Sequence, residues 1–122
     1  MSIYHITFAR DWERARESGE YTISTLGRTL AEQGFIHAGE GHQVAQVANF
    51  LFAPYAEDAR QGRLIVLVID LDRLKPEVRY EQMPGADAPY PHIYGPLNTA
   101  AVTATAPLTV TADGQFEFTP PD

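Results

Sequence analysis

The first part of the chain changes from an alternating pattern of hydrophobic and polar residues to a mainly polar one. Residues 2–8 alternate loosely, which predicts a strand. From residue 9 the chain is polar around a single large apolar residue, Trp12, and Gly19 follows the stretch. This pattern predicts a helix over residues 9–18, because glycine commonly follows the end of a helix.

The strongest helical pattern lies in the middle of the chain. Apolar side chains there recur every three or four residues, as expected for one buried helix face: Val44, Val47, Ala48, Leu51 and Phe52. Pro54 is predicted to end this helix. Three short elements precede it: a strand or extended loop over 21–25, a helical turn over 29–33 and a brief strand over 35–37.

The second half of the chain is rich in strand patterns. Residues 63–71 contain an uninterrupted apolar run from Leu64 to Ile69, which predicts a central strand over 63–71 that is buried on both faces. The remaining elements are expected as a turn at 72–75, a strand at 78–82, a loop at 83–91, a strand at 92–95, a helical turn at 97–100, strands at 102–106 and 108–111, and a tight hairpin into a C-terminal strand at 115–119. We therefore predict one α+β domain over residues 1–122, with a largely antiparallel sheet and two or three helices in its N-terminal half.

Composition and charge narrow the class of protein. The chain is 44% apolar, which is enough for one core, and it contains no cysteine for a disulfide or a zinc–thiolate site. Its formal charge of −7 makes nonspecific nucleic-acid binding unfavourable, although a small anion in a locally basic cleft stays open. We expect no membrane span and no signal peptide, and hence a cytoplasmic protein.

Three of the four histidines lie in short apolar, strand-like phrases. His5, His37 and His92 fall one in each third of the chain. They are either separate histidines, each hydrogen bonded locally, or members of one shared polar pocket, in which Thr7, Tyr94 and Asn98 would supply orienting hydroxyl or amide groups. A three-histidine metal site is a further alternative that no local motif requires.

Other polar and aromatic residues are candidates for the same pocket. Arg79 and Glu81 share a strand face, either as a solvated pair or with Glu81 near the histidines and Arg79 holding an anion. The sequence favours pocket positions for Tyr21, Tyr90 and Tyr94, and core positions for Trp12, Phe50 and Phe52.

The turn at residues 38–41, directly after His37, contains two glycines. It is expected to present unpaired backbone N–H groups suited to an anion or a carbonyl oxygen. The chain has no phosphate-binding glycine loop and no nucleophile elbow. The first absence disfavours nucleotide binding by a phosphate loop, and the second disfavours acyl transfer by a serine nucleophile.

Several of these phrases together resemble a bacterial family, domain of unknown function 952. The resemblance covers about residues 3–110 and rests on Tyr4-His5-Ile6-Thr7, Trp12, Gly34-Phe35-Ile36-His37, Gln43-Val44, Ala48-Asn49 and Pro91-His92-Ile93-Tyr94-Gly95-Pro96-Leu97. It implies an ADP-ribosylation-like fold, a split body of two sheets with a cleft for nicotinamide or ADP-ribose. In such transferases a first-strand residue holds the ribose, a role that His5 fits. His37 falls in the second motif, and His92 falls where a glutamate is expected.

The leading hypothesis is a small protein that binds or processes NAD, ADP-ribose or a related nucleotide as substrate. His5, His37 and His92 are its candidate catalytic residues, and the candidate substrate-binding residues are Thr7, Tyr94, Arg79, Glu81 and Asn98. The alternatives are a noncatalytic module that binds a small metabolite and a metal-dependent enzyme with three histidine ligands. No bound cofactor or metal is assigned from the residues, and the oligomeric state is not indicated.

Overall fold

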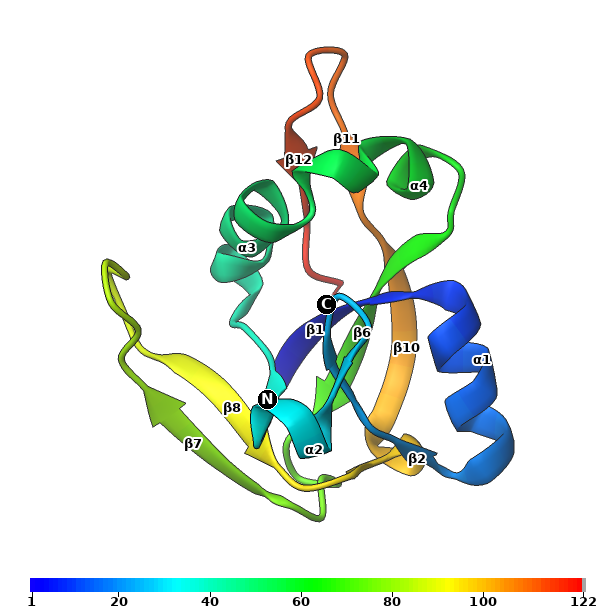
Figure 1. Ribbon diagram of the computed structural model, residues 1–122, viewed down its shortest axis with the longest axis vertical. Coiled ribbons are helices and arrows are strands. Elements are labelled where there is room, and N and C mark those ends of the chain that lie inside the picture. The colour runs from blue at the N-terminus through cyan, green and yellow to red at the C-terminus, as the bar shows by residue number, and fades with distance from the viewer. Residues whose placement is uncertain (122) are drawn as a thin grey trace.

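The computed structural model describes residues 1–121 and contains two antiparallel three-stranded sheets (Figure 1). In the first sheet, β6 (Leu64–Asp70) lies between β1 (Ser2–Phe8) and β10 (Val102–Pro107). This confirms the predicted central strand. In the second sheet, β8 (Tyr90–Tyr94) lies between β5 (Ile36–His37) and β7 (Glu77–Glu81).

The first sheet separates two hydrophobic cores because side chains alternate between its faces. Tyr4 and Ile6 of β1 belong to the core that also contains residues of the helices α3 (Val44–Leu51) and α4 (Ala56–Arg60). Ile3 faces the other core, which contains Trp12 of the helix α1 (Ala9–Ser18) and buried residues of the second sheet. His5 and Thr7 are also buried and have the same parity as Ile3, so the strand period places two polar side chains on an apolar face.

Four α-helices precede β6, one more than the largest number predicted: α1 (Ala9–Ser18), α2 (Leu30–Gln33), α3 (Val44–Leu51) and α4 (Ala56–Arg60). The two longest match the predicted ones, and α3 ends before Pro54 as expected. Pro54 itself lies in a 3₁₀ turn, Ala53–Tyr55. α4 is not among the helices predicted from the sequence, because its five residues are too few to show a helical period.

Short two-stranded ladders complete the fold. They pair β2 (Glu20–Tyr21) with β9 (Leu97–Asn98), β3 (Ile23–Thr25) with β4 (Arg28–Thr29), and β11 (Thr109–Val110) with β12 (Phe116–Glu117). The predicted helical turn at 97–100 is instead β9 followed by a 3₁₀ turn over Thr99–Ala101, and the C-terminal strand is shorter than predicted. Every ladder is antiparallel, so the predicted α+β class with antiparallel pairing is confirmed.

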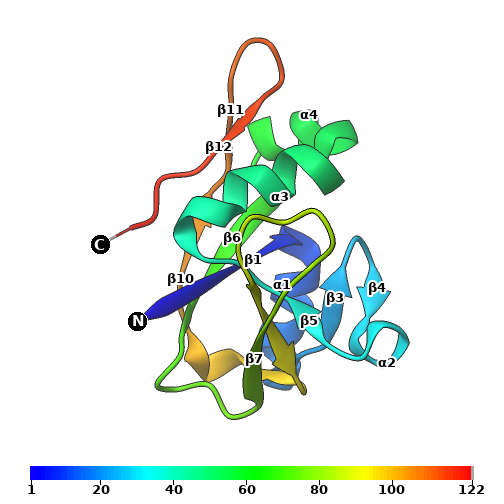
Figure 2. The same cartoon turned by 90° about the vertical axis from the view of Figure 1, so that its left-hand side faces the viewer.

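An isolated bridge between Tyr4 and Gly39 joins the two sheets. Each residue donates its backbone N–H to the other's carbonyl oxygen at 2.8 Å. Figure 2 shows this region, with α3 above β1 and β5. The bridge brings β1, which carries His5, next to β5, which carries His37. Over residues 1–121, the structure contains no helix that is both long and apolar enough to cross a bilayer.

Candidate functional site

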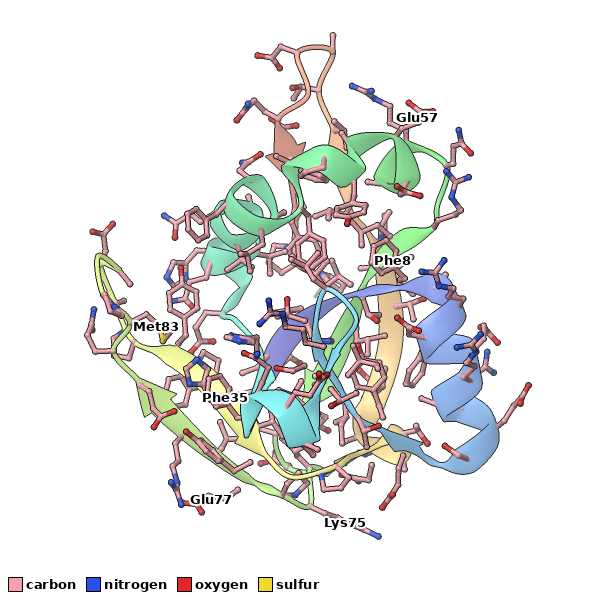
Figure 3. All side chains as sticks on the ribbon, viewed as in Figure 1. Phe8, Phe35, Glu57, Lys75, Glu77 and Met83 are labelled. Atoms are coloured by element: carbon pink, nitrogen blue, oxygen red, sulfur yellow. The ribbon has the colours of Figure 1, made fainter. Side chains whose placement is uncertain are left out.

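A cavity of about 480 Å³ lies where the two sheets meet. Its wall is formed by residues of β1, β5 and α3 and by the loop after β7, which includes Met83 (Figure 3). His5, His37 and His92 all line it. The structure therefore brings together the three histidines that the sequence singled out, although they come from three different strands.

His5 is held at both ring nitrogens by other residues of the chain. Nδ1 is hydrogen bonded to the backbone carbonyl of His37, and Nε2 lies 2.7 Å from the hydroxyl of Tyr21. That hydroxyl is in turn 2.7 Å from the hydroxyl of Thr7. Because a carbonyl only accepts, His5 donates from Nδ1 and accepts from Tyr21 at Nε2, and the Thr7 hydroxyl is left to donate to Tyr21.

Burial keeps this chain of hydrogen bonds uncharged at neutral pH. Desolvation lowers the pKa of His5 to about 4, and the hydrogen bond to the His37 carbonyl only partly opposes it. Desolvation likewise raises the pKa of Tyr21 far above its ordinary value. His5 and Tyr21 therefore form a neutral polar unit inside the core, with one edge of His5 at the cavity wall.

His37 has a freer side chain than His5. Its ring is half-buried and makes no hydrogen bond to any residue between 1 and 121. Its ring centroid lies 4.8 Å from that of Phe35 and 5.5 Å from that of His92. Desolvation, followed by the charge of nearby His92, lowers the pKa of His37 to about 4, so this ring is also neutral at pH 7.

His92 is oriented by a carboxylate on the neighbouring strand. Its Nδ1 lies 2.7 Å from Oε1 of Glu81, which also accepts a hydrogen bond from the Tyr94 hydroxyl. The Tyr94 and His92 hydrogen bonds lower the pKa of the Glu81 carboxyl. Glu81 in turn raises the pKa of the Tyr94 phenol. A carboxylate that holds one nitrogen of a histidine is the usual way to orient an acid–base imidazole.

The other features of His92 are a stacked ring and an unpaired nitrogen. Phe35 stacks on its ring, with centroids 4.0 Å apart and planes 17° from parallel (Figure 3 labels Phe35). Nε2 of His92 is buried and has no hydrogen-bond partner among the described residues. The ring is therefore held on one face and at one nitrogen, while its second nitrogen is buried and unpaired within the described residues.

The structure places the remaining predicted site residues in different settings. Thr7 contacts the His5 chain through Tyr21, and both Glu81 and Tyr94 support His92. Arg79 lies directly across from His92 in the strand register, but its exposed guanidinium turns to Glu77 and to the ring of Tyr94. It lies outside the cavity wall and does not form the predicted anion clamp there.

Asn98 holds a surface loop. Its side-chain oxygen accepts the backbone N–H of Lys75 at 2.9 Å, and its amide donates to the carbonyl of Arg73 at 3.0 Å. Asn98 is not part of the cavity wall. Asn98 therefore anchors this loop and is not in contact with the histidines.

The expected row of unpaired N–H groups after His37 is wrong. Ala38 donates its N–H to the Pro91 carbonyl, Gly39 donates to Tyr4, and Glu40 donates to the side-chain oxygen of Gln43. Gln43 precedes α3 and belongs to a capping box with Glu40. Three amides of this turn are thus occupied, and the turn does not form the anion cradle that its glycines suggested.

Two aromatic residues differ from their predicted positions or went unnoticed. Phe50 was expected in the core, yet it is 84% exposed at the rim of the cavity. Phe35 was not assigned a role, although it packs against both His37 and His92. Strand alternation offered one signal, because residues 35 and 37 share a face of the strand predicted over 35–37.

The arrangement does not match a three-histidine metal centre. A histidine ligand must offer a nitrogen lone pair to the metal, and both nitrogens of His5 are hydrogen bonded within the protein. Among residues 1–121, no group of three or more His, Asp or Glu side chains is arranged to hold a metal ion.

Comparisons with known proteins identify the family but no activity. Residues 6–105 match the family model described as "Protein of unknown function (DUF952)", and the chain belongs to that family. The crystal structure of protein CC0527 from Caulobacter crescentus is similar, with 29% identity, a TM-score of 0.77, and coverage of 96% of this chain and 94% of that one. Its solution NMR structure has 30% identity and a TM-score of 0.71, covering 93% of this chain and 90% of that one. Both are structural genomics targets. No curated protein matches the chain.

Proposed function

We propose that this cavity binds a small, uncharged and largely apolar molecule, and that His92, oriented by Glu81, is its acid–base group. One observation carries the proposal: a histidine with a carboxylate on one nitrogen, and with no partner for the other among residues 1–121, lines a cavity of about 480 Å³. Ligand sites commonly have this size, and they combine apolar walls with a few placed polar groups.

The composition of the wall favours an uncharged ligand. Apolar side chains of α3 and of the loop after β7 form much of it, including Val47, Leu51 and Met83. None of the described residues that line it is a lysine or arginine, and its one formally charged residue is Asp87. Because His5 and His37 are neutral at pH 7, a phosphate would find no strong cationic partner at the wall.

A nucleotide such as NAD or ADP-ribose is the second candidate. The three histidines in one cavity support it, since the ADP-ribosylation-like reading assigned them to a nucleotide cleft. Glu81 also stands beside His92, where that reading expects a glutamate. If such a nucleotide binds, its base or nicotinamide ring occupies the cavity and its phosphates extend beyond the wall.

Titration with a panel of compounds tests the proposal. The panel contains uncharged aromatic and aliphatic fragments together with NAD, ADP-ribose and inorganic phosphate, and binding is followed by protein NMR. We expect saturable binding of uncharged fragments that shifts signals of His37 and His92. Turnover of a bound compound would assign an enzyme, and saturable binding without turnover would assign a noncatalytic module.

Two tryptophan variants localise the binding. Gln46→Trp introduces bulk at an exposed position on the cavity wall, whereas Glu57→Trp does so at an exposed position on α4 away from it. Fragment affinity should fall in the first variant and stay unchanged in the second. Equal affinity in both variants, or no fragment binding at millimolar concentrations, would count against the proposed site.

A further inference from the structure

The unpaired nitrogen of His92 identifies the polar group of the molecule that the cavity accepts. We infer that the bound molecule carries an O–H or N–H group and donates a hydrogen bond from it to Nε2 of His92. This inference rests on the proposed function, and it adds the chemical class of the ligand: an alcohol, phenol or amide N–H on an apolar body.

The hydrogen bond at Nδ1 determines what Nε2 can do. Glu81 carries an ionised carboxylate, which only accepts, so Nδ1 of His92 keeps its proton and points it at Glu81. In the neutral imidazole the second nitrogen then has a lone pair and no proton. Nε2 is thus a hydrogen-bond acceptor, and the ligand group that pairs with it must be a donor.

The burial of His92 makes a vacant acceptor unusual. The residue is 1% exposed, and Nε2 has no partner among the described residues. Buried polar atoms in folded proteins are nearly always hydrogen bonded. Because His92 also lines the cavity, a ligand bound there lies beside its ring and reaches Nε2 once a neighbouring side chain moves.

The neighbouring rings show how a ligand would approach. Phe35 covers one face of His92, with ring centroids 4.0 Å apart, and is part of the packing. His37 stands edge-on, 5.5 Å away, and no hydrogen bond to the rest of the described chain holds its half-buried ring. His37 is therefore the neighbour of His92 whose side chain can turn to admit a ligand without displacing a strand.

Matched pairs of small molecules test this class directly. Phenol is compared with anisole, and benzyl alcohol with benzyl methyl ether, so that each pair differs by one donor proton and one methyl group. Dissociation constants come from NMR titration at about pH 8, so that the neutral form of imidazole is compared throughout. We expect each donor to bind roughly tenfold tighter than its methyl ether, the range of one hydrogen bond.

Three variants assign the preference to one ring. His92→Phe removes the acceptor and keeps an aromatic ring, His37→Phe does the same at the neighbouring ring, and His42→Phe alters an exposed histidine outside the wall. The preference for donors should disappear only in His92→Phe. If that variant does not fold, the ¹⁵N shift of Nε2 in the wild-type protein should move on adding phenol and stay fixed on adding anisole.

The outcomes separate this inference from the proposed function. Binding of neither member of a pair, nor of any other uncharged fragment, would contradict the proposed function itself. Equal binding of both members at the cavity would leave that function standing and overturn the inference, as expected if a water molecule satisfies Nε2. Loss of the preference in His37→Phe but not in His92→Phe would also overturn it.

Discussion

Glu81 and His92 lie on neighbouring strands two positions out of register, and Oε1 of Glu81 is 2.7 Å from Nδ1 of His92. Glu81 is directly opposite Tyr90, so this contact is a diagonal one across the ladder. Tyr94 reaches the same carboxylate oxygen from two residues farther along β8. A carboxylate at the surface thus fixes the orientation of a buried ring at the cavity.

Glu81→Ala should allow the neutral ring of His92 to change from the Nδ1–H tautomer to the Nε2–H tautomer. With the carboxylate gone, Nδ1–H loses its acceptor, and the proton can move to Nε2. Long-range ¹H–¹⁵N spectra of the neutral ring should show a protonated Nδ1 in the wild type and a larger share of protonated Nε2 in the variant. Glu77→Ala, on the same strand, is the control, because Glu77 pairs with Arg79 on the surface. Identical His92 spectra in the wild type and in Glu81→Ala would refute the orienting role.

Tyr21→Phe should destabilise the protein by about 1–3 kcal/mol, the cost of leaving a buried polar atom unpaired. The change removes the hydroxyl that donates to Nε2 of His5, while the ring still fills its place in the core. Urea unfolding measures the difference. Tyr55→Phe is the matched control, since no hydrogen bond from the Tyr55 hydroxyl to the described chain is present. Equal stability of the two variants would contradict the proposed His5–Tyr21 unit.

Acidification should destabilise the fold through His37. Its pKa is about 4 in the folded protein against an ordinary value of 6.5, so between these values the unfolded chain binds more protons. The stabilising contribution is complete above pH 6.5 and is lost as the pH falls toward 4, by on the order of 2 kcal/mol.

The His37→Gln variant isolates that contribution. Its free energy of unfolding should depend less on pH between 6.5 and 4 than that of the wild type, because the titrating ring is gone. The exposed His42 provides the control, and His42→Gln should retain the wild-type slope. Parallel pH profiles for wild type and His37→Gln would show that His37 titrates normally.

Phe50→Ser should leave stability unchanged within about 0.5 kcal/mol and weaken the binding of apolar fragments. Phe50 is 84% exposed but borders the cavity, whereas neighbouring Phe52 is 2% exposed and also borders it. The matched Phe52→Ser variant should cost about 3–5 kcal/mol or more, because it removes a core side chain. Unfolding curves and fragment titrations of both variants test this difference. Unchanged fragment affinity in Phe50→Ser would remove Phe50 from the site.

Much of the frame could be predicted because its signals are local. β6 is apolar on both faces from Leu64 to Ile69, and α3 shows a regular helical period. α4 could not be found in this way, since it has five residues and one buried side chain, Ala59. The same limit explains β9, whose two residues become a strand only by pairing with β2.

The candidate site was partly predictable for a different reason. Histidines within apolar phrases indicated buried imidazoles, and all three line one cavity. Which partner each histidine takes depends on strand register and on side-chain direction, neither of which has a local signal. Arg79 is opposite His92 in the ladder, yet Glu81, at a diagonal position, makes the contact. The turn after His37 differs from its prediction because Gln43 and the strands on either side satisfy its amides.

One spectrum tests the central claim most directly: the long-range ¹H–¹⁵N correlation of the four histidine rings, recorded while phenol is added. We predict that the signals of His92 and His37 move together and saturate with one dissociation constant, with the largest change at Nε2 of His92. The exposed ring of His42 should not respond. Saturable shifts at His42 alone, or no saturable shift at His92, would contradict a ligand site built on the His92–Glu81 pair.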